Sequence, residues 1–173
     1  MCKKALFLDR DGVINYDYGY VHTKEKFDFV AGVFKTLLHA QNKGYLIIII
    51  TNQSGIGRGM YSLDKFMELN NWMIEEFEKN KIKVNKVLFC PHSPSQKCLC
   101  RKPLPKLFLE AKEKFQIDME KSWAIGDKET DIKAANSAGV LNTVLLNNNQ
   151  KARPNKSQAK YVVESIVSLI KIL

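Results

Sequence analysis

The sequence predicts an α/β fold, a Rossmann-like parallel sheet with helices on both of its faces. Short apolar runs typical of strands alternate along the chain with longer segments that have the apolar spacing of helices. Residues 45–50 form an unbroken run of apolar and β-branched side chains, as expected of a strand that is buried on both faces. In such folds ligands bind at the carboxyl ends of the strands.

The N-terminal half begins with a predicted strand at residues 5–8, an apolar run that ends at acidic residues. Apolar side chains at helical spacing predict a helix over 33–42, with Gly44 just past its end. The buried strand at 45–50 follows, and Ser62 can then cap a long helix. The apolar face of that helix would consist of Phe66, Met67, Met73, Ile74 and Phe77.

The C-terminal half continues the alternation. Further strands are expected at residues 86–89, 123–125, 143–146 and 161–163. A helix over 105–115 begins at a proline, which suits a first turn, and Gly139 would close a helix over 131–138. A last helix is expected over 164–172. The polar stretch 147–156 is typical of an exposed connection.

Length and composition predict one domain over residues 1–173, because domains usually contain about 150 residues. Hydrophobic residues make up 45% and charged residues 26%, as in ordinary globular proteins. The longest apolar run, 46–50, is too short to cross a membrane, and the N-terminus does not fit a signal peptide. We therefore expect a cytoplasmic protein without a membrane partner, and we expect a monomer.

The net charge is +9, from 27 basic and 18 acidic side chains, and part of the excess lies in residues 151–173. Such a balance favours anionic partners, which include nucleic acid, acidic lipid and phosphorylated metabolites. A solvated basic surface explains the same charge. The charge alone therefore does not identify the ligand.

Polar side chains follow four of the predicted strands. They are Asp9-Arg10-Asp11-Gly12 after the first, Thr51-Asn52 after the second, Arg101-Lys102 beyond the third, and Gly126-Asp127-Lys128 with Asp131 after the fourth. Each set alone is explained by a turn or a solvated surface. Four consecutive strand ends of this kind are not, so we expect them to form one site.

The residue types at these ends suit phosphoryl chemistry. Of Asp9 and Asp11, one carboxylate can attack phosphorus and the other can move protons. Asp127 could complete a magnesium site, because this cation binds a few carboxylates and keeps its waters. Asp131 stands at the start of a predicted helix, where the helix dipole favours an acid in any case.

Candidate phosphate-binding groups accompany the carboxylates. Thr51 and Asn52 offer a hydroxyl and an amide beside backbone N–H groups. Arg58 lies in the glycine-rich loop that follows. Arg101 can bind a phosphoryl group as a fork and Lys102 as a point charge, although an ordinary surface pair is the alternative.

A cysteine-rich loop follows the third strand. Cys90, His92, Cys98 and Cys100 offer three thiolates and one imidazole, while Cys2 stands alone. A secreted disulfide framework would spread its cysteines more widely. Four such ligands leave no open position, so we expect a structural zinc ion that clips the loop, with inert buried thiols as the alternative.

The motif series looks like that of the haloacid dehalogenase superfamily of phosphotransferases. The matching residues are Asp9-Arg10-Asp11-Gly12, Thr51-Asn52, Lys102, and Gly126-Asp127 with Asp131. The resemblance implies that Asp9 takes up the phosphoryl group, and that Asp11 protonates the leaving oxygen and then activates water. The other implied roles are phosphoryl binding by Thr51 and Lys102, Mg²⁺ binding by Asp9, the Asp11 carbonyl and Asp127, and support from Asp131 and Lys128.

Two narrower groups share the cysteine loop that runs into Arg101, Lys102 and Pro103, and these are the heptose bisphosphate phosphatases and the histidinol-phosphate phosphatases. Residues 17–22 and 51–59 are similar to the heptose enzymes. Their resemblance implies a phosphorylated sugar as partner, hydrolysis of the 7-phosphate of a heptose 1,7-bisphosphate, and heptose supply for lipopolysaccharide. The short spacing from His92 to Cys98 is similar to the histidinol-phosphate enzymes, so that substrate stays open.

The spacing of the motifs also predicts an open site. Residues 10–50 and 52–101 are filled by elements that the core needs, which leaves no room for a large cap domain. An open site and a basic chain raise the alternative of a nucleic-acid 3′-phosphatase, but no interleaved aromatic and basic platform supports it. A non-catalytic zinc-clipped binding module is a further alternative. The strand-end carboxylates disfavour it, since they would repel nucleic acid.

Overall fold

The computed structural model describes residues 2–147 and 157–173. Within them, six parallel strands form one sheet in the order β3-β2-β1-β4-β5-β6, which confirms the predicted fold class. The strands are β1 (Lys4–Leu8), β2 (Tyr45–Asn52), β3 (Val84–Cys90), β4 (Trp123–Gly126), β5 (Asn142–Leu146) and β6 (Tyr161–Val163). Strands β2 and β3 follow on one side of β1, and β4, β5 and β6 follow on the other. The strand order therefore reverses between β1 and β4, which is where open α/β sheets bind ligands.

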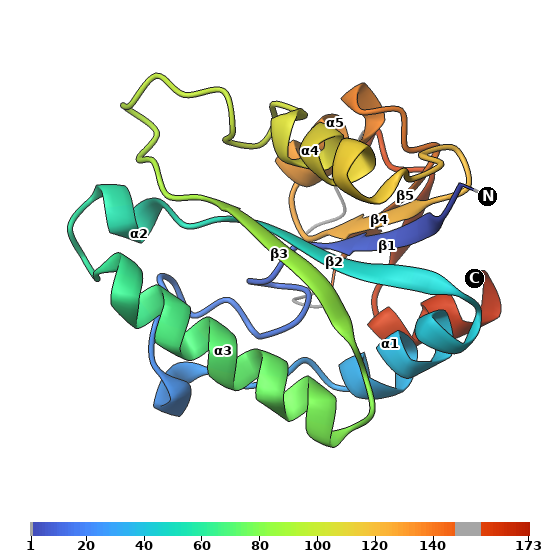
Figure 1. Cartoon of the computed structure of the whole chain (residues 1–173), viewed down its shortest axis with the longest axis horizontal. Coiled ribbons are helices and arrows are strands. Elements are labelled where there is room, and N and C mark those ends of the chain that lie inside the picture. The colour runs from blue at the N-terminus through green and yellow to red at the C-terminus, as the bar shows by residue number, and fades with distance from the viewer. Residues whose placement is uncertain (1, 148–156) are drawn as a thin grey trace.

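Helices cover both faces of the sheet. They are α1 (Val33–Asn42), α2 (Ser54–Gly57), α3 (Leu63–Lys79), α4 (Lys106–Phe115) and α5 (Glu129–Ser137), with 3₁₀ turns η1 (Lys24–Lys26) and η2 (Ile166–Lys171). In Figure 1, α4 and α5 lie above the sheet, and α1 and α3 lie below it. The turn η2 packs beside α1 on the lower face.

One hydrophobic cluster lies on each face of the sheet, because successive side chains of a strand point to opposite faces. In β1, Leu6 and Leu8 point into the cluster shared with α1 and α3, whereas Phe7 points into the cluster shared with α4 and α5. In β2, Ile47 and Ile48 divide in the same way. A strand buried on both sides must therefore be apolar throughout.

Three local predictions need correction. The helix expected from residue 131 begins at Glu129, because the Asp131 carboxylate accepts a hydrogen bond from the Lys128 N–H and so stands in the first turn. The last helix, expected over 164–172, is instead the 3₁₀ turn η2. Met67, placed on the apolar face of α3, is 40% exposed. Most of the predicted connection 147–156 lies outside the described residues.

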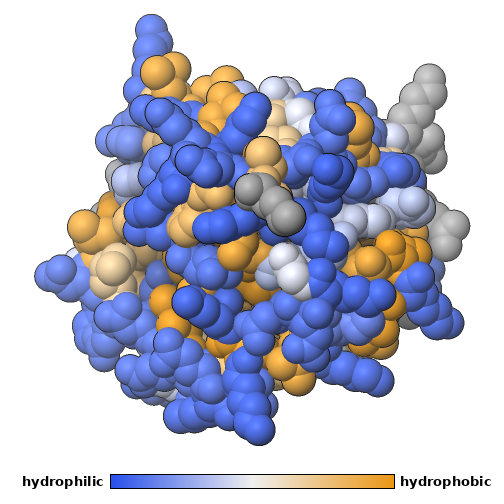
Figure 2. All heavy atoms as spheres, turned by 45° about the vertical axis from the view of Figure 1, so that its right-hand side comes forward, coloured by the Kyte–Doolittle hydropathy of each residue, from blue (hydrophilic) through white to orange (hydrophobic). Residues whose placement is uncertain are grey.

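The described chain holds no large cap in either predicted gap. Between Asp9 and Thr51 lie η1 and α1, and between Thr51 and Lys102 lie α2, α3 and β3. Among the described helices, none is long and apolar enough to cross a membrane. Hydrophilic side chains predominate on the face in Figure 2, and hydrophobic ones show between them.

Candidate active site

The strand ends predicted from the sequence converge over the middle of the sheet. Strand β1 lies between β2 and β4, and Leu8 is in register with Ile49 on one side and Ile125 on the other. The backbone N–H of Asp9 donates to the carbonyl of Ile125 at 3.0 Å, which ties the end of β1 to β4. A cavity of about 540 Å³ opens here, with Asp9 and Asp11 in its wall.

Lys102 lies at the centre of the site. Its Nζ is 3.1 Å from Oδ1 of Asp9, 2.6 Å from Oδ1 of Asp131 and 2.7 Å from the carbonyl of Ile50. Burial opposes the charged form of this amine, but Asp131 and Asp9 outweigh burial and raise the pKa of Lys102. The side chain is therefore a fixed cation beside the Asp9 carboxylate.

The loop that carries Lys102 is held by Asn52 at the end of β2. The Asn52 amide donates to the carbonyl of Lys102 at 3.2 Å, and its oxygen accepts from the Lys102 N–H at 3.1 Å. Asn52 was predicted to bind phosphate. Its side chain lines the cavity, and both its nitrogen and its oxygen bind this backbone, which fixes where Lys102 enters the site.

Three carboxylates face one another beside this amine. Carboxylate oxygens of Asp9, Asp127 and Asp131 all lie within 4.8 Å of one another. Burial raises the pKa of Asp9 to about 7, and the neighbouring acids add to this rise while Lys102 opposes it. Burial likewise raises the pKa of Asp127 to about 6. Oδ1 of Asp127 is buried with no hydrogen-bond partner among the described residues.

Two glycines allow this close approach. Gly12 has φ of +89°, and a Cβ on it would lie 2.4 Å from Cγ of Asp127. A Cβ on Gly126 would lie 2.2 Å from Cβ of Asp131. The backbone turn after β1 thus packs against one carboxylate, and the end of β4 packs against another.

Asp11 is held by donors on both of its oxygens. Oδ1 accepts from Nη2 of Arg10 at 2.8 Å and from Nδ2 of Asn15 at 3.1 Å. Oδ2 accepts from Nε2 of Gln53 at 3.0 Å. Arg10 is itself buried and also donates to the carbonyl of Val21.

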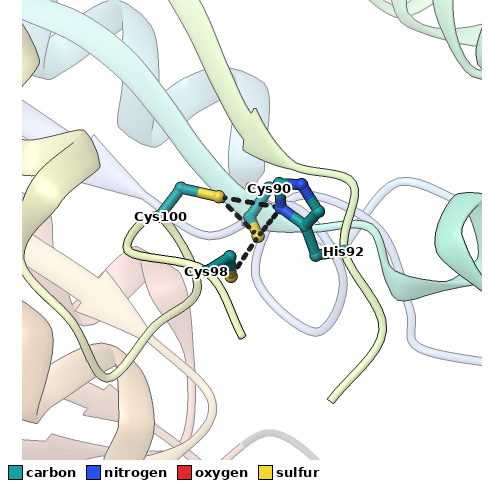
Figure 3. Close-up of side chains that lie close together, drawn as sticks. All are labelled: Cys90, His92, Cys98 and Cys100. Carbon is teal, nitrogen blue, oxygen red and sulfur yellow. Dashed lines mark hydrogen bonds between the residues drawn. The ribbon is translucent and has the colours of Figure 1, made fainter. Parts of the chain in front are cut away.

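The cysteine loop forms a second cluster at the end of β3. Figure 3 shows the side chains of Cys90, His92, Cys98 and Cys100 pointing toward one another, and one ligand atom from each lies within 4.8 Å of the others. Sγ of Cys90 is 3.7 Å from Sγ of Cys98 and 3.5 Å from Nδ1 of His92. Ligands about 2.1–2.3 Å from a tetrahedral zinc ion are separated by similar distances. Sγ of Cys100 lies nearer, 2.8 Å from Sγ of Cys90, so the donor set fits zinc once these two sulfurs move apart.

The cavity wall includes two other predicted residues, Arg101 and Lys128. Nη1 of Arg101 donates to the carbonyl of His92, and Nζ of Lys128 lies 3.0 Å from Asp17 and 3.7 Å from Asp127.

Thr51 and Arg58 are not among the residues that line the cavity. Thr51 is buried, and its hydroxyl accepts from Nε2 of Gln53. Arg58 is exposed.

Sequence reasoning missed roles for Gln53, Tyr61 and Asp17. The hydroxyl of Tyr61 donates to Oε1 of Gln53, and Asp17 binds Lys128 across the cavity. Gln53 stood within the predicted phosphate-binding stretch and Asp17 within a stretch noted for its resemblance. No sequence pattern indicated Tyr61, whose place in the wall depends on how α2 turns the chain.

The chain is similar to known phosphatases. A family model described as HAD-hydrolase-like matches residues 99–169. A Helicobacter pylori protein named D-glycero-beta-D-manno-heptose-1,7-bisphosphate 7-phosphatase is 44% identical over 97% of this chain and 98% of its own length. The protein of that name from Pasteurella multocida is 40% identical over 99% and 97%.

A solved structure is also similar over nearly the whole chain. It is D,D-heptose 1,7-bisphosphate phosphatase from B. bronchiseptica, complexed with magnesium and phosphate. It has a TM-score of 0.89 at 26% identity and covers 98% of this chain and 97% of its own. With these relatives, the chain belongs to the D-glycero-β-D-manno-heptose-1,7-bisphosphate 7-phosphatase family of HAD-like hydrolases.

Proposed function

We propose that this protein hydrolyses the 7-phosphate of D-glycero-β-D-manno-heptose 1,7-bisphosphate through an aspartyl-phosphate intermediate, and so supplies heptose for lipopolysaccharide. The observation that carries the proposal is the position of Lys102, whose ammonium group lies beside the Asp9 carboxylate at the floor of a 540 Å³ cavity. The full-length relatives named for this reaction support the substrate.

In the first step a carboxylate oxygen of Asp9 attacks the phosphorus atom and the bond to the sugar oxygen breaks. Asp11 gives a proton to that leaving oxygen. Lys102 and the Thr51 hydroxyl hold the phosphoryl oxygens, since this transfer depends mainly on positioning and charge neutralisation. In the second step Asp11 takes a proton from water, which attacks the phosphorus and restores the Asp9 carboxylate.

The residues present fit a magnesium ion. Asp9, the Asp11 carbonyl and Asp127 would hold Mg²⁺, which would neutralise charge on the transferred group when bound. The unpartnered Oδ1 of Asp127 supports this ligand set, because a buried carboxylate oxygen ordinarily has a partner. Burial raises the pKa of Asp9 and of Asp127, and a bound cation would favour their charged forms.

The cysteine cluster fits a structural zinc ion with no open position. Cys90 lies at the end of β3, and Cys100 is followed directly by Arg101 and Lys102. A zinc ion here would fix the loop between the strand and the catalytic lysine. In this proposal zinc acts on structure and not on the reacting phosphate.

The phosphate that is not cleaved needs a cation at the rim of the cavity. Arg101 and Lys128 both line this cavity, so we assign them to that phosphate or to the sugar hydroxyls. Arg58 was predicted to share this role, and its exposed side chain lies outside the cavity wall.

The test of the proposal is the position of cleavage. The heptose 1,7-bisphosphate is incubated with the protein and Mg²⁺, and the remaining phosphate is followed by ³¹P NMR. The proposal predicts that the signal of the 7-phosphate disappears while the 1-phosphate persists, and that a chelator of Mg²⁺ stops the reaction. Loss of the 1-phosphate first would contradict the proposed orientation of the substrate.

A further inference from the structure

Gln53 connects Asp11 and Thr51, two residues that the proposed reaction uses. Its side chain is buried, and its Nε2 donates to Oδ2 of Asp11 at 3.0 Å and to Oγ1 of Thr51 at 2.9 Å. One amide nitrogen thus satisfies two acceptors with its two hydrogens. These hydrogen bonds connect the loop after β1 with the end of β2.

Tyr61 holds the other end of this amide. Its hydroxyl donates to Oε1 of Gln53 at 2.7 Å. Burial raises the pKa of Tyr61 to about 12, so the phenol keeps the proton that it donates. The ring packs closely on Gly55, where a Cβ would lie 2.1 Å from Cε1 of Tyr61. On its other side the ring stacks on His22, with 4.8 Å between centroids and 9° between planes.

The opposite orientation of the amide would fail at its contact with Asp11. It would place the oxygen of Gln53 against the Asp11 carboxylate, an acceptor, whereas the hydroxyls of Tyr61 and Thr51 can either donate or accept. Buried polar groups that face a like partner are costly. The hydrogen bonds from Tyr61 to Gln53 and from Gln53 to Asp11 are therefore held in one arrangement.

We propose that Gln53, anchored by Tyr61, is a positioning residue that holds the Asp11 carboxyl for proton transfer to the leaving oxygen. The inference rests on the proposed function, in which Asp11 is the acid. The described residues between the motifs form no large cap that could place this group when substrate binds. A fixed amide in the wall of an open site performs that task instead.

If Gln53 positions Asp11, its loss should affect substrates with poor leaving groups more than those with good ones, which a general loss of structure would not do. When phosphate moves to Asp9, a sugar alkoxide needs the proton from Asp11, whereas p-nitrophenolate is a stable anion and leaves without one. The value of kcat/KM reports steps up to departure of the leaving group. Misplacing Asp11 should therefore lower kcat/KM for the sugar phosphate far more than for p-nitrophenyl phosphate.

The experiment compares Gln53→Leu and Tyr61→Phe with the wild type on both substrates, with Asp11→Asn as the benchmark. Gln53→Leu is expected to lower kcat/KM for the heptose bisphosphate by about 10- to 100-fold more than for p-nitrophenyl phosphate, which is a part of the roughly 10²- to 10⁴-fold that general acid catalysis contributes. Tyr61→Phe should give a smaller loss of the same selectivity. Met60→Ala, the exposed neighbour of Tyr61, should leave both substrates unchanged.

A double variant tests whether Tyr61 acts on Asp11 through Gln53. If Tyr61 acts through Gln53, then adding Tyr61→Phe to Gln53→Leu should produce no further selective loss. Equal losses on the two substrates for both single variants would overturn the inference, and would leave these side chains with a structural role alone. A wild-type protein that hydrolyses neither substrate with Mg²⁺ would instead overturn the proposed function.

Discussion

The Nζ of Lys102 lies 2.6 Å from Oδ1 of Asp131, and both side chains are buried. This pair joins the loop after β3 to the first turn of α5. Asp131 also accepts from the Lys128 N–H, so the same carboxylate starts the helix and holds the lysine. Charge pairs of this kind are costly to break from one side, because a buried charge is then left alone.

Lys102→Met is therefore expected to destabilise the fold as well as to remove activity. It leaves Asp9 and Asp131 buried without their shared cation, and the loss of one partner from a buried pair costs about 3–5 kcal/mol. Urea unfolding measures the change in the free energy of unfolding. Lys65→Met is the control, because it breaks the exposed pair Lys65–Glu68 and should leave stability unchanged. Equal stabilities of the two variants would refute the buried network.

Asp9→Asn is expected to abolish turnover and to leave the fold intact. The amide has the shape of the carboxylate but is no nucleophile, so kcat should fall by about 10⁴-fold or more. The substitution also removes a charge that burial disfavours. Phosphate release measures turnover, and circular dichroism with thermal unfolding monitors the fold. A folded variant with near-normal turnover would exclude Asp9 as the group that takes up phosphate.

Gly12→Ala is expected to weaken Mg²⁺ binding through Asp127. The new Cβ would overlap the Asp127 carboxyl, which must move. We expect the Mg²⁺ concentration at half-maximal activity to rise by about 10-fold or more, as for losses of groups that orient metal ligands.

Gly44→Ala is the matched control for backbone strain. Gly44 has φ of +83°, close to that of Gly12, but a Cβ there meets nothing within 4 Å. Both variants should lose about 1 kcal/mol of stability from the left-handed conformation. Only Gly12→Ala should change the response to Mg²⁺. A similar response in the two variants would show that Asp127 does not bind the ion.

Cys98→Ser is expected to release zinc and to lower the midpoint of thermal unfolding. Removal of one of four ligands opens a closed tetrahedral site. Activity should fall with it, because the loop leads directly into Lys102. Elemental analysis of purified protein should give about one zinc per chain for the wild type and for the control Cys2→Ser. Zinc at the wild-type content in Cys98→Ser would contradict the assigned ligand set.

Local patterns were sufficient to predict the sheet and the positions of its strand ends. The apolar run of β2 and the acids after β1 are visible in the sequence because burial on two faces and a polar strand end each leave a contiguous signal. The prediction missed the start of α5, since the carboxylate of Asp131 caps the helix from its first turn instead of preceding it. It also missed η2, whose residues 166–171 have apolar side chains that suit either kind of helix.

Pairings between distant segments could not be predicted from the sequence. Gln53 and Asn52 are neighbours with similar amides, yet one holds Asp11 and the other holds the backbone of Lys102. Which amide takes which partner depends on the backbone at the end of β2, since Asn52 is the last residue of the strand and Gln53 leads into α2. Tyr61 contacts Gln53 only because α2 turns the chain back over the strand end.

The central claim is tested most directly by phosphate release, with Mg²⁺, from D-glycero-β-D-manno-heptose 1,7-bisphosphate and from histidinol phosphate in parallel. The account predicts a kcat/KM for the heptose bisphosphate that is higher by about 100-fold or more, which corresponds to about 2.7 kcal/mol of transition-state binding. A preference for histidinol phosphate would contradict the account. It would show that the short loop from His92 to Cys98 sets the substrate class in spite of the relatives.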